Sequence, residues 1–115
     1  MIGDKALSRD SAIVLVLAIL REGSRHGYDI AREVERRSDR ALTFKHATLY
    51  LVLHEMENDA LISSQWEHPG GERPRRVYSL TAAGVAECDR RLATWARFTE
   101  AMGKVIAGGE NSPLA

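Results

Sequence analysis

The chain has little of what marks many classes of protein. Its one cysteine, Cys88, cannot form an internal disulfide, so nothing ties the fold to an oxidising compartment and the expected location is the cytoplasm. Only 6% of its 115 residues are aromatic, and 16 basic residues balance 16 acidic ones. A formal net charge of zero argues against a basic nucleic-acid coat or membrane binder, so any contact with DNA must use locally arranged charge.

Long hydrophobic runs are lacking too. The apolar run from Ala12 to Leu20 is far shorter than the ~20 residues that cross a bilayer. It is followed by Arg21 and Glu22, where a signal peptide would have small residues for cleavage. No membrane contact is expected. A run without a polar face predicts a helix covered on all sides, which implies a partner surface.

Patterns that carry catalysis or metal binding are also absent. The four histidines and Cys88 do not fall at tight ligand spacings, so we expect no metal and no cofactor. The sequence has no phosphate-binding glycine loop followed by lysine, and no serine framed as a nucleophile elbow. No catalytic residue is predicted, and an enzyme is not expected.

The segment from Lys45 to Ile62 is the most informative stretch that is present. Its apolar residues recur at steps of three and four, which predicts an amphipathic helix with one buried face. The outer face carries Leu51 and His54, with Thr48, Tyr50 and Glu55 beside them. We interpret this outer face as one that lies in a DNA groove.

Two helices are expected before this segment. The first is capped by Ser8 or Ser11 and runs to about Glu22, and the second follows Gly27 and has a charged, solvated outer side. Leu42 and Phe44, in the turn that follows, are expected to tuck under the next helix.

Residues 63–68 and 75–80 have strand character, and the turn-rich residues 69–74 between them predict a β-hairpin. Arg73, Arg75 and Arg76 lie near its tip against a single Glu72, and they form the clearest local positive charge. Arginine suits phosphate or the minor groove. A solvated loop is the alternative.

Thr81 is expected to cap a long last helix that carries a heptad seam. The seam consists of Val85, Cys88, Leu92, Trp95, Thr99, Met102 and Ile106. A seam of this kind needs another helix to cover it. We expect this to be either the same helix of a second subunit or the first helix of that subunit, through Ile13 and Val16. Residues 1–81 then form a DNA-binding domain, 82–107 a dimerisation helix and 108–115 a flexible tail.

The predicted order is helix, helix, helix, hairpin, helix, which is a mainly α fold of the winged helix-turn-helix type with a long C-terminal dimerisation helix. Three segments resemble the PadR family of transcriptional regulators. They are residues 13–30 with His26-Gly27-Tyr28-Asp29-Ile30, the helix pattern Thr48-Leu49-Tyr50 with Met56-Glu57 and Leu61-Ile62, and residues 73–84. The single short C-terminal helix is similar to that of the smaller PadR subgroup, whose members form compact dimers.

The resemblance implies a homodimeric repressor that binds a pseudo-palindromic operator in double-stranded DNA and is released by a ligand or another signal. It places Thr48 and Tyr50 at the start of the groove-facing helix and the three arginines on the wing, which agrees with the roles of such residues on DNA. The predicted DNA-binding residues are Tyr28, Lys45, His46, Thr48, Tyr50, His54, Arg73, Arg75 and Arg76.

The chain departs from the family pattern at several positions. His46 and Ala47 stand where the family usually has proline and glycine, and Ala60 stands where it usually has glycine. Glu55 stands where many relatives carry a basic residue. This carboxylate is either solvated or accepts a hydrogen bond from a cytosine amino group.

Trp95 suggests an effector site. In a two-fold dimer two Trp95 indoles would face each other and hold a flat compound, with Phe98 and Thr99 beside them; packing in a dimer core is the alternative. The resemblance implies that the effector is a planar aromatic compound.

For the whole chain, the alternative is a winged-helix protein-interaction module with weak or no DNA binding, which the neutral charge would suit. A steep loss of DNA affinity with salt separates the two functions.

Overall fold

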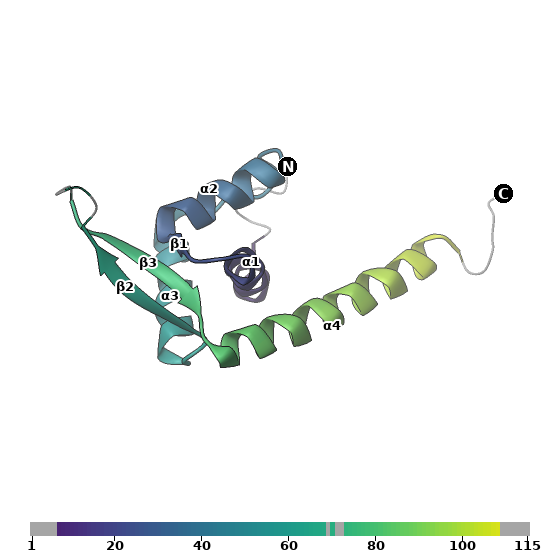
Figure 1. Ribbon diagram of the computed structural model, residues 1–115. Helices are drawn as coiled ribbons and strands as arrows, with labels where there is room; N and C mark the ends of the chain where they lie inside the picture. The colour runs from purple at the N-terminus through teal and green to yellow at the C-terminus, as the bar shows by residue number, and fades with distance from the viewer. Residues whose placement is uncertain (1–6, 69, 71–72, 109–115) are drawn as a thin grey trace.

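The computed structural model describes residues 7–68, 70 and 73–108, and most of the predicted tail lies outside these residues (Figure 1). The elements in chain order are α1 (Arg9–Arg21), β1 (Arg25–His26), α2 (Gly27–Arg37), α3 (His46–Asn58), β2 (Ile62–Glu67), β3 (Arg75–Leu80) and α4 (Ala82–Ile106). A mainly helical fold with a small sheet and a long last helix was predicted, and it is confirmed.

The sheet has three antiparallel strands in the order β1-β3-β2. The predicted hairpin pairs Ile62 with Leu80 at its base and Glu67 with Arg75 near its tip. Strand β1 was not predicted, because two residues are too few to show a strand period. It exists because Arg25 and His26 pair with Tyr78 and Val77 of β3. This pairing joins the start of α2 to the β2–β3 hairpin, which we call the wing.

Helix α1 is the centre of the core. The Ser8 hydroxyl accepts a hydrogen bond from the backbone N–H of Ser11 at 3.1 Å, so Ser8 is the N-cap. The helix packs against α2, α3, α4 and β3 of the same chain. Ile13 and Val16, predicted at a dimer interface, are only 6% and 0% exposed in the single subunit. The prediction is corrected for these two residues, because their side chains are covered by their own chain.

Helices α2 and α3 complete this core. They contribute Ile30, Leu49, Leu53 and Met56, each almost fully buried. Leu42 and Phe44 pack against the cluster from the turn before α3, as predicted. Because one face of α3 is held in this way, the opposite face is turned outward.

The end of α3 contains a strained residue. The helix ends at Asn58, earlier than predicted, and Ala60 adopts a left-handed backbone with φ of 61°. The Leu61 N–H donates to the Met56 carbonyl at 3.0 Å, which closes the helix end. A left-handed conformation costs a residue with a Cβ ~1–2 kcal/mol, whereas glycine adopts it freely.

Ala60→Gly is therefore expected to stabilise the protein by about 0.5 kcal/mol, because relief of this strain exceeds the added entropy of the unfolded chain. Urea unfolding at a fixed protein concentration should show a higher midpoint with an unchanged slope. A lower midpoint would contradict the assignment of strain to this position.

The junction between the wing and α4 is fixed by short contacts. The Thr81 hydroxyl accepts from the Gly84 N–H at 3.0 Å and donates to the Ala60 carbonyl at 2.7 Å, which confirms the predicted cap. A Cβ at Gly84 would lie 2.0 Å from the Leu61 carbonyl oxygen, so only glycine fits. These contacts set the direction in which α4 leaves the domain.

Helix α4 starts on the domain and then projects away from it (Figure 1). Cys88, predicted in the seam with a second subunit, is 0% exposed and belongs to the core of its own chain, which corrects that prediction. Beyond it, the large apolar side chains of α4 are between 36% and 79% exposed: Leu92, Trp95, Phe98, Met102, Val105 and Ile106. We call these six residues the α4 stripe.

No helix in the described part of the chain is long and apolar enough to cross a membrane.

Candidate nucleic-acid interface

The outer face of α3 is exposed in the way the sequence predicts. Leu49, Val52 and Leu53 point into the core, and on the other side His46, Tyr50 and His54 are exposed. Lys45 is the exposed N-cap residue, and Thr48 is half-buried. This helix face can meet another molecule without any change in the packing of the core.

Aromatic rings from α2 and α3 form a column on this face. The His46 ring lies between those of Tyr28 and Tyr50, with centroid separations of 6.0 Å and 6.2 Å and interplanar angles of 16° and 15°. The Arg32 guanidinium lies 5.6 Å from the centre of the Tyr28 ring and extends the column. The predicted residues Tyr28, His46 and Tyr50 are therefore brought together, and both tyrosines remain exposed.

Gly27 positions the Tyr50 ring. A Cβ at residue 27 would lie 2.9 Å from the Tyr50 hydroxyl oxygen and 3.0 Å from its Cε1 atom, so the ring rests on the bare backbone at the start of α2. The structure thus links a glycine on one helix to a candidate DNA contact on the next.

Gly27→Ala is expected to displace the Tyr50 ring and to weaken DNA binding by roughly fivefold, about the loss of one modest hydrogen bond. The fold should survive, because the obstructing atoms belong to a mobile side chain. Fluorescence anisotropy with labelled DNA measures the affinity. In a Tyr50→Ala background the same substitution should have no further effect; an equal loss there would show that Gly27 acts by another route.

The wing carries arginines in two different environments. Arg76 donates from Nε to the Ser64 hydroxyl at 2.9 Å, and its Nη2 lies 3.4 Å from Glu57 Oε1. Ser64 in turn donates to Glu57 Oε2 at 2.7 Å, so Arg76 ties both strands of the wing to α3. Arg73 and Arg75 are exposed. Much of the charge of Arg76 is thus engaged in holding the wing.

Glu55 also has a role that the sequence did not reveal. Its Oε1 atom accepts a hydrogen bond from Arg9 Nε at 2.7 Å, and this bond raises the pKa of the Arg9 guanidinium. The carboxylate is therefore paired across 46 positions to the start of α1 rather than simply solvated. Its negative charge on the outer face of α3 is partly compensated.

The face between the wing and the helices is hollowed into a cleft of about 370 Å³. Predicted residues Tyr28, Tyr50, Arg75 and Arg76 line it, together with Pro74 and three residues that the sequence analysis did not select: His26, Trp66 and Tyr78. Burial raises the pKa of the Tyr78 phenol, which forms part of the wall. We call this hollow the wing cleft.

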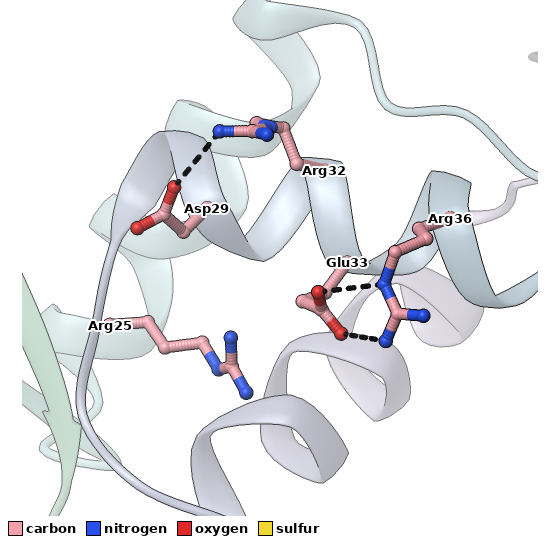
Figure 2. A pocket seen from close by; sticks show the side chains of 5 residues that line it. All are labelled: Arg25, Asp29, Arg32, Glu33 and Arg36. Atoms are coloured by element: carbon pink, nitrogen blue, oxygen red, sulfur yellow. Dashed lines mark hydrogen bonds and ion pairs between the residues drawn. The ribbon is translucent and has the colours of Figure 1, made fainter.

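A second hollow on α2 has a different character (Figure 2). It is lined by Arg25, Asp29, Arg32, Glu33 and Arg36, and opposite charges pair within it. Arg36 and Arg37 both donate to Glu33, and these bonds lower the pKa of its carboxyl group to about 2. Because the charges pair locally, this side of α2 has the solvated character that was predicted.

The residues predicted to bind an effector lie on the α4 stripe. Trp95 and Phe98 are exposed, with ring centroids 5.8 Å apart, and the Thr99 hydroxyl donates to the carbonyl of Ala96 in its own helix. Trp95 also borders an apolar groove of about 540 Å³ against α1, which Asp10, Val14 and Leu15 help to line.

Among residues 7–68, 70 and 73–108, no group of three or more His, Cys, Asp or Glu could hold a metal ion.

The three-helix core with a hairpin packed beside its third helix is the winged helix-turn-helix arrangement, a class in which the third helix and the hairpin form one surface. Residues 16–90 match the sequence profile of the transcriptional regulator PadR-like family. The chain belongs to this family of transcriptional regulators.

Several known proteins and solved structures are similar to the chain. The chain is 27% identical to protein X of Lysinibacillus sphaericus over 84% of this chain and 88% of that protein. A PadR family transcription regulator from Clostridium difficile has a solved structure with a TM-score of 0.74 and 28% identity, over 83% of this chain and 97% of that one. The structure of Bacillus subtilis PadR in complex with operator DNA has a TM-score of 0.64 and 25% identity; the match covers 70% of this chain and 45% of that one.

Proposed function

We propose that the chain is a homodimeric repressor that binds a pseudo-palindromic operator in double-stranded DNA and releases it when a planar aromatic effector binds. The observation that carries this proposal is the position of the exposed α3 face beside the arginine-bearing wing, with the α4 stripe projecting elsewhere. One surface is then available for DNA and the other for a second subunit. Such a regulator acts in the cytoplasm.

On DNA, the start of α3 enters the major groove and the wing lies along the backbone. Thr48 and His54 reach base edges, while the tyrosine hydroxyls, Lys45 and the wing arginines donate to phosphates. The complex of Bacillus subtilis PadR with operator DNA supports this placement by similarity. Because the net charge of the chain is zero, the local wing charge supplies the electrostatic attraction.

The test is binding to labelled DNA from the region upstream of the chain's own gene, measured from low to high salt. Affinity is expected to fall steeply, with a slope of log K against log salt near −0.9 for each phosphate contacted. The competing function, a protein-interaction module, is favoured by Leu51, which is exposed in the middle of the outer α3 face. Absence of any DNA binding at low salt would favour that module.

The α4 stripe supports the homodimer. It is longer and more apolar than a solvated helix requires, and a two-fold partner would cover the same residues on both copies. Leu92, Trp95, Thr99, Met102 and Ile106 form the interface in this proposal, with Val85 at its start.

The effector proposal rests on Trp95. Its indole is exposed beside Phe98 and borders the apolar groove against α1, so a flat molecule can stack on it. In a Trp66→Phe variant Trp95 is the sole tryptophan, and planar aromatic dyes are expected to quench its fluorescence and to lower DNA affinity. Dyes that leave both quantities unchanged would count against the site.

A further inference from the structure

Trp66 is the most exposed aromatic side chain in the described part of the chain, at 61%, and the DNA contacts proposed above do not include it. It is the last residue but one of β2, and the β2–β3 hairpin extends from the domain in a different direction from α4 (Figure 1). It borders the wing cleft together with the exposed tyrosines Tyr28 and Tyr50. Three exposed aromatic side chains gathered around one cleft form the kind of surface patch that marks an interaction site.

The Trp66 indole is held in place by Arg76. Trp66 pairs with Arg76 across the hairpin, and the Arg76 guanidinium lies 5.5 Å from the centre of the Trp66 ring and 5.9 Å from that of Tyr78. The same guanidinium is held by Ser64 and Glu57. The Trp66 ring therefore packs against a guanidinium group that is anchored to α3, and the exposed surface of the ring is available to a ligand.

The chemistry around Trp66 favours an anionic ligand. Arg75 and three tyrosines, Tyr28, Tyr50 and Tyr78, line the same cleft. Of the nearby carboxylates, Glu57 bonds to Arg76 and Ser64, whereas Glu67 follows Trp66 on β2 and therefore lies on the opposite face of the strand. Hydrogen-bond donors and apolar ring surfaces together match a sugar-phosphate strand, whose phosphates accept hydrogen bonds and whose sugars offer apolar surface.

We propose that Trp66 is a DNA-contact residue whose indole packs on a deoxyribose of one strand beside the groove that α3 enters, while its N–H donates to an adjacent phosphate. This inference rests on the proposed function, because it requires that the wing and α3 bind duplex DNA. Arg76 then acts as a positioning residue: it keeps the indole at the distance from α3 that the strand requires.

Fluorine NMR of the full chain labelled with 5-fluorotryptophan tests the contact directly. The chain has two tryptophans, so the spectrum has two signals, and a Trp66→Phe spectrum assigns them. On addition of upstream DNA, the Trp66 signal is expected to shift in step with the anisotropy of the same labelled DNA. If anisotropy shows binding and the Trp66 signal does not move, the inference is overturned while the proposed function stands.

Affinity measurements with variants complete the test. Trp66→Ala is expected to bind DNA about tenfold more weakly, and Trp66→Phe should recover most of that loss because it keeps a ring. Gln65→Ala, the neighbouring exposed position on the other face of β2, is the matched control and should bind as the unmodified chain does. Equal affinity of Trp66→Ala and Gln65→Ala would overturn the inference. If the unmodified chain binds no DNA at low salt, the proposed function fails first and this inference with it.

Discussion

Met102→Asp is expected to convert the protein into monomers and to weaken operator binding by about 100-fold. Met102 lies in the α4 stripe, is 45% exposed and is not part of the core, so the variant leaves the core of the subunit unchanged. In a two-fold interface the substitution places two carboxylates in an apolar seam, which is strongly unfavourable. A monomer can contact only one half-site, and the loss of bivalent binding typically costs a factor of ~100 or more.

Light scattering after gel filtration measures the mass, which should fall to the 12.8 kDa of one chain from twice that value. Ala93→Asp is the matched control: it adds the same charge to α4 at an exposed residue that faces away from the stripe, because successive helical residues are ~100° apart. The control should remain dimeric and bind DNA normally. A Met102→Asp protein that stays dimeric would show that the α4 stripe is not the interface.

Arg75→Glu is expected to weaken binding to every DNA sequence by about 100-fold at low salt. The substitution removes a phosphate interaction in each subunit and places a carboxylate beside the backbone. Because a dimer has two copies of Arg75, the slope of log K against log salt should become shallower by about 2. Arg75 is a cleaner target than Arg76, because Arg76 also ties the wing to Glu57 and Ser64.

Arg97→Glu provides the same charge change at an exposed site of α4 that faces away from the α4 stripe. It should leave the affinity and the salt slope nearly unchanged. If both variants lose affinity equally, the attraction depends on the total charge of the protein, and the wing has no special role.

Several features of the site could be predicted from the sequence because they depend on neighbours along the chain. The outer face of α3 follows from the steps of three and four that bury Leu49, Val52 and Leu53. The Thr81 cap follows from a hydroxyl three positions before Gly84, and the arginine-bearing hairpin follows from two strands around a turn-rich tip.

Other parts of the site could not be predicted, because they join residues that are distant in sequence. Trp66 is one more strand residue until the register places it opposite Arg76 and the fold brings both to Tyr50. The bond between Arg9 and Glu55 likewise depends on how α1 crosses α3. Alternation along each strand is visible in the sequence, but without the register it does not place Trp66 and Arg76 on a common face.

The sequence by itself determined the helices, the wing, the projecting α4 and the resemblance to the PadR family, since local periodicity and motifs suffice for these. Only the tertiary structure decided which apolar positions the subunit covers for itself. Ile13, Val16 and Cys88 lie in its core, whereas Trp95 and Met102 remain exposed, although all five fit the same predicted interface. The reason is physical: a periodic pattern marks a side chain as one that must leave water, but the packing of the other elements determines which surface covers it.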